Sequence, residues 1–549
     1  MMKKLFFALV LIPALIACNN NGTNSDGSES SSSSSSKSEK DKKISKRDFS
    51  INASNAYNNL FFDSSALEKF ITEEKVSDSI SRRMRSFYNT RNYQYAWFSP
   101  DGLTEQARGF WNMHSYHTTY TNDSALKDKV LQKKMDGLIE DEFSVSASDK
   151  SILKTELTLT EHFILYALNN IEDGYLKRKE MERFIPRRKE DPIMLADSLL
   201  AKKHKDNKYY EDVNENYKKL KAVMEQYVGI QKAGGWPVMD VSVKKIKTGA
   251  AIALLKKRLQ LSGDMPGIDT SAVFNDSLKN AIMNFQQRHG YTADGKLTDA
   301  QLKDMNVPVI KRIEQILINM GRMQWMVTNP SGRRIVVNIP EYILHVTKDG
   351  AKDFDMNVVV GKDGHNTVMF TGNLNQVVFS PYWNVPASIV KNELLPKMAS
   401  NPDYLASQEM EINGQDGDLP SIRQLPGDKN ALGRVKFLFP NSFNIYFHDT
   451  PSKSLFNNDK RAYSHGCIRL SDPVKMANYV LQDDPEWTPS KIEDAMNAGV
   501  EKYVKVKKSI PVLITYYTAW VDDAGQLHFA DDIYNHDTPL AAKMFTGSY

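Results

Sequence analysis

The chain has 549 residues, which is too many for a single hydrophobic core and predicts three or four domains. Its 71 Lys and Arg residues nearly balance its 67 Asp and Glu residues, so the net charge is only +4. A charge so close to neutral gives no electrostatic attraction for nucleic acid, and we exclude nucleic acid as a partner.

The first residues have the pattern of an export signal. Lys3 and Lys4 precede an apolar stretch from Leu5 to Ala17 that is shorter than the roughly 20 residues a membrane span needs. The end of this stretch, Leu15-Ile16-Ala17-Cys18, resembles the lipobox of bacterial lipoproteins. The resemblance implies a signal peptide over residues 1–17 and a lipid on Cys18. The alternative is an ordinary signal peptide followed by an incidental cysteine.

Residues 18–47 are expected to form a disordered tether. They are mostly Asn, Gly, Ser and Lys, with a serine run from Ser30 to Ser36, and they contain too few apolar residues to bury a core. As a flexible coil the segment has an r.m.s. span of roughly 30 Å, which is enough to hold a folded body away from a membrane surface.

The chain contains only two cysteines, Cys18 and Cys467. If Cys18 carries lipid, Cys467 has no cysteine to pair with. A free thiol in an oxidising compartment is a liability unless it is buried or used, so Cys467 is a candidate nucleophile. The alternative is a buried structural cysteine.

The spacing of apolar residues changes along the chain. Residues 48–240 carry apolar side chains at helical spacing, which predicts a helical scaffold domain, and residues 307–331 return to that spacing. From residue 332 onward the sequence favours strands, at 334–340, 342–346, 357–360, 376–380 and 435–439. The predicted fold class is therefore α+β and multidomain, with a mostly-β domain over residues 332–520 and an extension over 521–549.

Residues 246–306 form a small module with three expected helices, at 250–259, at 275–289 and around Leu302 after an N-cap at Thr298. The module resembles the three-helix peptidoglycan-binding domain, notably in Phe285-Gln286 with Asp294-Gly295 downstream. The alternative is a structural spacer that binds no glycan.

Two stretches carry the residues for nucleophilic catalysis, at 445–451 and 463–470. An ordinary cysteine is only a few per cent ionised at neutral pH, so a cysteine nucleophile needs a base or a cation nearby. His465 lies two residues before Cys467, His448 lies nineteen residues before it, and Arg469 follows it. Local chemistry leaves both histidines open as the base.

The pattern of His448, fifteen residues, and then Ser464-His465-Gly466-Cys467-Ile468-Arg469 resembles the motif of the L,D-transpeptidase family with the YkuD-type catalytic domain. The resemblance implies that Cys467 is the nucleophile, that His448 is the general base and that the backbone carbonyl of Asp449 orients the imidazole. The Asp449 carboxylate is the alternative orienting group.

The same resemblance implies roles for the rest of the motif. Gly466 would let backbone N–H groups, including that of Cys467, face a developing oxyanion. His465 and Ser464 would support the loop, with Ser464 also counted among the substrate-binding residues. Arg469 would supply positive charge, with a structural salt bridge as the alternative.

Residues 379–386 and 431–437 resemble the larger enzymes of YcbB type, which insert a mobile capping segment between these two motifs. The insert would run from about 386 to 427. Trp383 and Tyr446 would then flank the substrate groove, with Asn384 also at the substrate. Core packing is the alternative role for Trp383.

The function implied by the resemblance is a transpeptidation without a metal or cofactor. Cys467 would attack a tetrapeptide stem, release D-Ala and form a thioester, which the amine of an acceptor stem would resolve into a crosslink between third residues. Carbapenems would acylate the same thiol. The alternatives are an L,D-carboxypeptidase, an enzyme that attaches or releases a wall-linked protein, and a non-catalytic wall-binding lipoprotein.

The expected partners are the donor and acceptor stem peptides, the membrane through the lipid on Cys18, and a D,D-carboxypeptidase that supplies tetrapeptides. The expected location is the cell envelope, at the periplasmic face of the outer membrane. Asn19 favours this membrane because it is not the acidic residue that can signal retention at the inner one.

Overall fold

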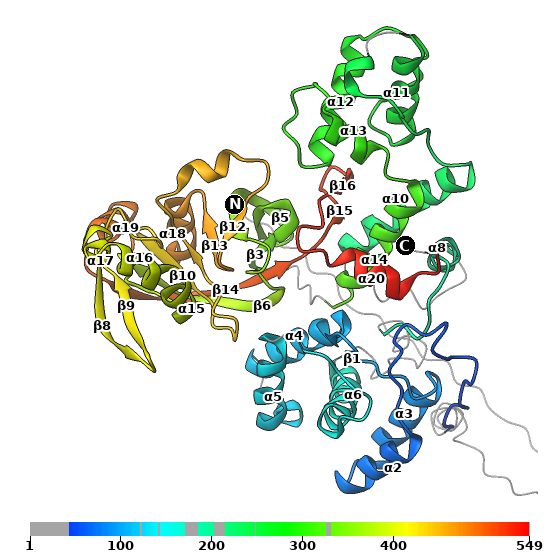
Figure 1. The fold of residues 1–549 in the computed structure, drawn as a ribbon, viewed down its shortest axis with the longest axis horizontal. Coiled ribbons are helices and arrows are strands. Elements are labelled where there is room, and N and C mark those ends of the chain that lie inside the picture. Colours follow the sequence, from blue (N-terminus) through cyan, green and yellow to red (C-terminus); the bar gives the residue numbers. More distant parts are fainter. Residues whose placement is uncertain are drawn as a thin grey trace, which may run out of the picture. The chain divides into compact units, whose positions relative to one another are not determined.

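The computed structural model describes residues 43–120, 123–140, 143–170, 185–201, 215–246, 249–325 and 331–547. The predicted signal peptide, Cys18 and most of the predicted tether lie outside these residues. Helices predominate up to residue 325 and strands predominate after residue 331 (Figure 1), which gives the α+β multidomain class expected from the sequence. In the described part of the chain, no helix combines the length and the apolar character that crossing a membrane requires.

The scaffold is a helical domain built around aromatic side chains. Trp97, Phe110 and Phe163 are buried, and the Trp97 ring centroid lies 5.3 Å from that of Phe110 and 5.4 Å from that of Phe163. A short hairpin, β1 (Phe98–Ser99) and β2 (Gly102–Leu103), follows Trp97. The scaffold helices are α2 (Ser64–Glu73), α3 (Asp78–Asn89), α4 (Glu105–Tyr120), α5 (Lys129–Glu140), α6 (Lys150–Asn170), α8 (Pro192–Leu200), α10 (Glu215–Lys232) and α14 (Val309–Met323).

The small module contains the three expected helices, α11 (Ala250–Leu261), α12 (Asp276–Arg288) and α13 (Asp299–Met305). Thr298 caps α13 in a reciprocal capping box with Gln301. The Gln286 side chain donates to Asp294 Oδ1 at 2.9 Å and accepts from the N–H of Gly295 at 2.8 Å. The two dipeptides singled out in the sequence are therefore partners that fix the turn before α13.

The end of the chain returns to the scaffold. The hairpin β15 (Ala519–Val521) and β16 (Leu527–Phe529) and the helix α20 (Asp537–Met544) contribute buried side chains to the scaffold core. Helix α14 contacts α20 and β15 directly. Segments that precede and follow the β domain along the chain thus complete the scaffold core.

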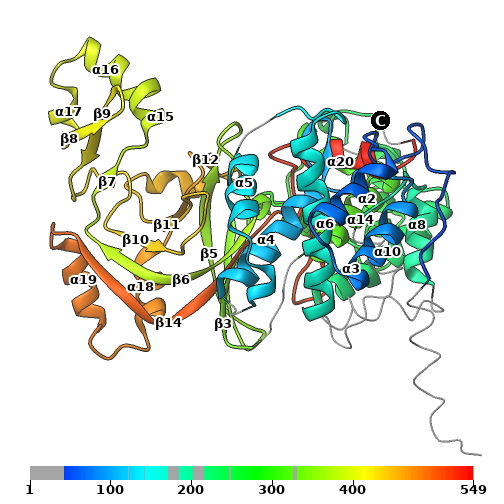
Figure 2. The same ribbon diagram turned by 90° about the horizontal axis from the view of Figure 1, so that it is seen from below.

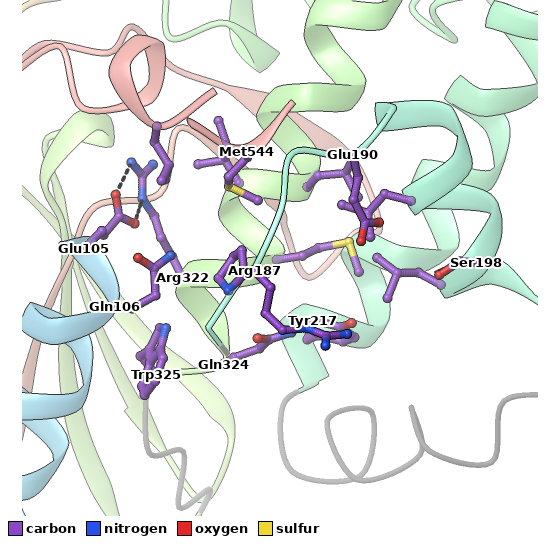
Figure 3. Close-up of a pocket in the computed structure, with 18 of the residues that line it drawn as sticks. Glu105, Gln106, Arg187, Glu190, Ser198, Tyr217, Arg322, Gln324, Trp325 and Met544 are labelled. Atoms are coloured by element: carbon purple, nitrogen blue, oxygen red, sulfur yellow. Dashed lines mark hydrogen bonds and ion pairs between the residues drawn. The ribbon is translucent and has the colours of Figure 1, made fainter. Parts of the chain in front are cut away.

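A buried ion-pair cluster joins these segments. Arg322 of α14 is 2% exposed and lies 2.8 Å from Glu105 Oε1 of α4 and 2.6 Å from Asp537 Oδ1 of α20. The two carboxylates hold the pKa of Arg322 above its ordinary value, although burial alone lowers it. Figure 3 shows Arg322 and Glu105 beside a cavity of about 370 Å³ that Gln106, Tyr217 and Met544 also line.

The β domain is a nine-stranded sheet with the order β12-β5-β13-β11-β10-β6-β14-β3-β4. Because β4 also pairs with β5, the sheet closes on itself. The expected strands appear here, and β14, which the sequence analysis did not single out, pairs with both β3 and β6. Helices α18 (Pro473–Leu481) and α19 (Pro489–Asn497) pack on the sheet. The strands are β3 (Arg333–Asn338), β4 (Ile343–Lys348), β5 (Ala351–Gly361), β6 (Phe370–Phe379), β10 (Val435–Leu438), β11 (Phe447–His448), β12 (Ala462–Ser464), β13 (Ile468–Leu470) and β14 (Lys502–Thr515).

The capping insert is a folded subdomain with its own sheet and core. Strands β7 (Trp383–Asn384), β9 (Leu419–Gln424) and β8 (Met410–Asp416) pair in that order. Val385, Val390, Leu394 and Ile422 form its buried cluster. Its helical part consists of α15 (Ala387–Ile389), the π-helical turn η6 (Val390–Leu394), α16 (Leu395–Ser400) and α17 (Tyr404–Ser407). Figure 2 shows these elements grouped together. The subdomain begins at Trp383, a few residues before the predicted start at 386.

The Arg322 cluster predicts a large loss of stability when the cation is removed. Arg322→Leu leaves Glu105 and Asp537 partly buried without their partner, and breaking such a pair costs roughly 3–5 kcal/mol. Lys232→Ala is the control, because Lys232 makes an exposed ion pair with Asp197 at 2.7 Å and exposed pairs contribute about 0–1 kcal/mol. Chemical denaturation of the two variants measures the difference, and equal losses would contradict the role of the cluster.

Candidate active site

The site is built on the pairing of two short strands. Strand β11 runs parallel to β13 with Phe447 opposite Ile468 and His448 opposite Arg469. Phe447 and Ile468 are fully buried in the core of the sheet. Because successive side chains of a strand point to opposite faces, His448 and Arg469 point away from that core.

The same alternation places two more residues on this face. Tyr446 precedes Phe447 and Cys467 precedes Ile468, and the N–H of Ile468 donates to the carbonyl of Tyr446 at 3.1 Å. Tyr446, His448, Cys467 and Arg469 therefore share one face of the sheet. Their mutual influence on pKa agrees with this placement, since Arg469 affects both His448 and Cys467.

His448 is held as a neutral imidazole. Its Nδ1 is hydrogen-bonded to the backbone carbonyl of Asp449. A carbonyl can only accept, so Nδ1 carries the proton and Nε2 keeps its lone pair. Burial, followed by the charge of Arg469, lowers the pKa of His448 to about 3, although the hydrogen bond to Asp449 opposes this shift. The imidazole is therefore uncharged and able to accept a proton at Nε2.

The Asp449 carboxylate binds other groups. Its Oδ2 accepts from the N–H of Arg434 at 2.9 Å, and its Oδ1 accepts from the N–H of Thr450 at 2.7 Å and from Lys453 Nζ at 2.6 Å. A Cβ on Gly433, where φ is +61°, would lie 2.3 Å from Asp449 Oδ2. The carboxylate thus fixes the chain entering β10, while the main-chain carbonyl contacts the imidazole.

Cys467 has a protonated thiol in its resting state. Burial raises its pKa, and the N–H and hydroxyl of Tyr446 together with Arg469 oppose the shift. Its Sγ lies 3.6 Å from the carbonyl of Asn444, to which it donates weakly. The N–H of Cys467 has no hydrogen-bond partner among the described residues, so it is free for an external acceptor.

Tyr446 provides a phenol beside the sulfur. Burial, followed by the interaction with Cys467, raises the pKa of Tyr446 far above its ordinary value. The hydroxyl is therefore protonated and able to donate. Tyr446 was expected to flank a substrate groove, and the structure places it on the same face as His448 and Cys467.

The loop before Cys467 is fixed by Ser464. The Ser464 hydroxyl donates to the carbonyl of Cys467 at 2.5 Å and accepts from the N–H of Gly466 at 3.2 Å. Ser464 is 2% exposed, so its hydroxyl supports the loop and is not placed to contact a substrate. The N–H of Gly466 is thereby occupied, whereas the N–H of Cys467 has no partner among the described residues. Gly466 has φ +107°, a conformation that favours glycine.

His465 points to the capping insert. Its Nε2 lies 3.0 Å from Glu393 Oε1 of the π-helical turn η6. Burial lowers the pKa of His465, and Glu393 opposes the shift. Because its ring nitrogen is engaged with Glu393, His465 does not occupy the position of a base on the β11–β13 face.

Arg469 has no ion-pair partner among the described residues, so the salt bridge considered as an alternative is not formed there. Its Nε is buried without a hydrogen-bond partner in the same part of the chain. Burial lowers the pKa of Arg469, and Cys467 opposes the shift. The side chain is a cation beside the thiol that is available to an anionic group.

Trp383 and Asn384 lie in the capping insert. They form β7 and pair with Gln424 and Arg423 of β9. Trp383 packs against the buried cluster of the insert, as in the core-packing alternative, and Asn384 is exposed. The structure does not bring either residue onto the face shared by His448 and Cys467.

Thr367 contacts the loop before Cys467, Tyr534 contacts Thr367, and neither was predicted from the sequence as a site residue. Thr367 donates through Oγ1 to the carbonyl of Gly466 at 2.7 Å. Tyr534 accepts from the N–H of Thr367 at 3.2 Å. Neither residue lies in the Cys–His motif, so no local pattern marks them. The described residues contain no group of three or more His, Cys, Asp or Glu that could hold a metal ion.

Three family models match the chain. The "L,D-transpeptidase catalytic domain" matches residues 332–514, the "Scaffold domain" matches residues 82–224, and the "Putative peptidoglycan binding domain" matches residues 248–305. The first contains all the residues on the β11–β13 face. The third covers the helices α11 to α13.

A protein of Haemophilus influenzae named "Putative L,D-transpeptidase" is 30% identical over 290 residues, which cover 49% of this chain and 57% of that protein. Similar solved structures include an L,D-transpeptidase from Mycobacterium smegmatis, with 16% identity, coverage of 34% of this chain and 59% of that chain, and a TM-score of 0.20. Another, from Stackebrandtia nassauensis, has 14% identity, coverage of 49% and 92%, and a TM-score of 0.21. The sequence matches show that the chain carries an L,D-transpeptidase catalytic domain, together with a scaffold domain and a peptidoglycan-binding domain, and that it spans a little over half the length of the Haemophilus protein.

Proposed function

We propose that this protein forms crosslinks between the third residues of peptidoglycan stem peptides through a thioester on Cys467. The observation that carries the proposal is the register of β11 and β13. It places a neutral imidazole, a thiol and a cation on one face, beside a backbone N–H that has no partner among the described residues.

In the proposed acylation, Cys467 Sγ attacks the carbonyl of the third residue of a tetrapeptide stem and passes its proton to His448 Nε2. The N–H of Cys467 faces the oxyanion, and such a donor typically contributes about 3 kcal/mol of transition-state stabilisation. Collapse of the intermediate breaks the bond to D-Ala, whose nitrogen takes the proton from His448. A thioester remains on the enzyme.

In the second half of the reaction, the side-chain amine of an acceptor stem attacks the thioester. His448 accepts a proton from the amine, and the departing sulfur takes a proton back, so that the resting thiol and imidazole are restored. The raised pKa of Cys467 and the lowered pKa of His448 both favour this uncharged resting pair. A base is therefore needed at the moment of attack.

Arg469 is suited to the donor substrate. It is a cation without an ion-pair partner in the described part of the chain, and it points to the same face as Cys467. A tetrapeptide stem ends in a carboxylate, which a guanidinium binds well. We therefore assign Arg469 to this carboxylate, or to another anionic group of the donor.

The capping insert favours transpeptidation over hydrolysis. Glu393 of the insert reaches His465, which is two residues from the nucleophile, at 3.0 Å. A lid in this position excludes water from the thioester and leaves it to the amine. The alternative function, an L,D-carboxypeptidase, requires water to reach the same carbonyl.

We also propose a location in the cell envelope and partners there. The lipobox-like segment ending at Cys18 supports a lipid anchor in the cell envelope, at the periplasmic face of the outer membrane. The peptidoglycan-binding domain supports contact with the wall. A D,D-carboxypeptidase would supply the tetrapeptide donors, and carbapenems would acylate Cys467.

The direct test is the reaction with tetrapeptide muropeptides, followed by mass spectrometry of both products and protein. We expect new dimers joined between third residues, released D-Ala and an acyl adduct on Cys467, all of which Cys467→Ala abolishes. Trimmed tripeptides without dimers would refute the crosslinking and favour the carboxypeptidase. A Cys467→Ala protein that still forms dimers would refute the role of the thiol.

Separate substitutions of the two histidines test the assignment of the base. His448→Ala removes the proton acceptor and should slow acylation about 10²–10⁴-fold. His465→Ala removes a contact with the capping insert and should slow acylation much less. The rate of acyl-enzyme formation with a carbapenem, followed by intact mass, measures both. Equal rates for His448→Ala and the wild type would refute the assignment.

The pH dependence of acylation tests the uncharged resting pair. Because the pKa of His448 is about 3 and that of Cys467 lies above its ordinary value, the reactive form exists throughout pH 5–8. The acylation rate should therefore change by no more than about twofold in this range. An imidazole with the ordinary pKa of about 6.5 would instead lose roughly thirtyfold in its basic form by pH 5. A fall of that size would contradict the prediction.

A further inference from the structure

Two buried hydroxyl groups support the nucleophile loop from behind. Thr367 Oγ1 donates to the carbonyl of Gly466 at 2.7 Å and accepts from the N–H of Gly361 at 2.9 Å. The Tyr534 hydroxyl donates to the carbonyl of Gly361 at 2.6 Å and accepts from the N–H of Thr367 at 3.2 Å. The two hydroxyls therefore link residues 361–367, Gly466 and Tyr534, which are three parts of the chain that are distant in sequence.

The direction of each hydrogen bond is fixed by chemistry. A hydroxyl has one proton to donate, and a backbone N–H can only donate. The proton of Thr367 must therefore go to the Gly466 carbonyl, and that of Tyr534 to the Gly361 carbonyl. Thr367 is 2% exposed and Tyr534 is 6% exposed, so water has little access to replace either bond.

Fixing the carbonyl of Gly466 also fixes the N–H of Cys467. The two groups belong to one planar trans peptide and point in opposite directions. Since the carbonyl points inward to Thr367, the N–H points outward to the side where a substrate carbonyl would lie. This N–H has no hydrogen-bond partner among the described residues.

We propose that Thr367 and Tyr534 are positioning residues that aim the N–H of Cys467 at the oxyanion. The inference rests on the proposed function and assigns to it two residues outside the Cys–His motif. Neither side chain touches the substrate, because each acts through the Gly466–Cys467 peptide. Loss of either hydroxyl lets this peptide rotate and weakens the stabilisation of the oxyanion.

Tyr534 brings the C-terminal segment into the site. It follows the matched catalytic domain, which ends at residue 514. Its N–H donates to the Tyr516 hydroxyl at 2.9 Å, and the Tyr516 hydroxyl donates to Asp532 Oδ1 at 2.7 Å. Asp532 accepts from the N–H of Asp537 at 2.7 Å, and Asp537 pairs with Arg322 of the scaffold. A continuous series of polar contacts thus joins the scaffold to the nucleophile loop.

The test compares two reactions of Cys467 in the full-length protein. Acylation by a carbapenem passes through an oxyanion, whereas alkylation by iodoacetamide does not. Thr367→Val keeps the shape and removes the hydroxyl, so acylation should slow roughly 10–100-fold while alkylation of Cys467 stays within about twofold of the wild type. Thr367→Ser should restore acylation. Tyr534→Phe, which acts one hydrogen bond further away, should slow acylation by a smaller factor.

Matched controls separate positioning from stability. Thr515→Val removes another buried threonine hydroxyl, which donates to the carbonyl of Val337 at 3.0 Å, and Tyr57→Phe removes a buried phenol that donates to Gln106 at 2.8 Å. Both controls should acylate like the wild type. Peptide mapping quantifies alkylation at Cys467 separately from any at Cys18.

Several results would overturn the inference. Wild-type acylation in both Thr367→Val and Tyr534→Phe would refute it, as would a parallel fall in acylation and alkylation, which indicates general disorder of the loop. If Thr367→Val fails to fold, Tyr534→Phe alone decides between these results. A wild-type protein that is alkylated but never acylated would refute the proposed function itself, and the inference with it.

Discussion

The parallel pairing of β11 with β13 is the constraint on which the site depends. Only two residues of each strand are paired, yet their register decides which side chains meet. A shift of β11 by one residue would turn His448 into the core and expose Phe447, so that the imidazole would no longer share a face with Cys467. The neighbouring strands β10 and β5 prevent such a shift, because each pairs with one of the two short strands and belongs to the closed sheet. The same register therefore determines both which side chains form the apolar core and which side chains share the face of His448 and Cys467.

Asp449 shows how the sheet and the base are coupled. Its carbonyl orients the His448 imidazole, while its carboxylate holds the N–H of Arg434 at the start of β10. One residue thus links the base to the strand beside it. Burial of the imidazole has an electrostatic consequence, since the same packing that fixes the ring also lowers its pKa and keeps it neutral. The orientation and the protonation state of the base have a common structural origin.

Much of the fold and part of the candidate site could be predicted from the sequence. The features that could not be predicted depend on contacts between residues that are distant along the chain. The Cys–His motif lies within 22 residues of chain, and its resemblance to a known family singled out His448, Cys467 and Arg469, which share the β11–β13 face. The helices of the small module were predictable because their caps and apolar stripes are local signals. Ser464 was expected to support the loop and was also counted among the substrate-binding residues; its hydroxyl bonds the loop's own backbone, at the carbonyl of Cys467 and the N–H of Gly466. The sequence left Trp383 open between groove and core, and the structure pairs it with Gln424 of β9 and packs it, half-buried, against the cluster of the insert. Thr367 and Tyr534 act from about 100 and 70 residues away from Cys467 along the chain, where no periodicity or spacing indicates a contact.

The path of the chain explains why the domains are not simply joined end to end. The β domain begins after α14 and its last strand is followed by β15, so both of its ends lie against scaffold elements. The scaffold core contains side chains from α14 before the β domain and from α20 after it. Arg322 ties these two helices together, and Asp537, its partner on α20, is five residues beyond Asp532. Asp532 accepts from the Tyr516 hydroxyl, which in turn accepts from the N–H of Tyr534. The packing of α20 against α14 in the scaffold therefore also places Tyr534 behind the loop that carries Cys467. An isolated catalytic domain of residues 332–514 would keep the β11–β13 face but would lack the hydroxyl that completes the support of the Gly466–Cys467 peptide.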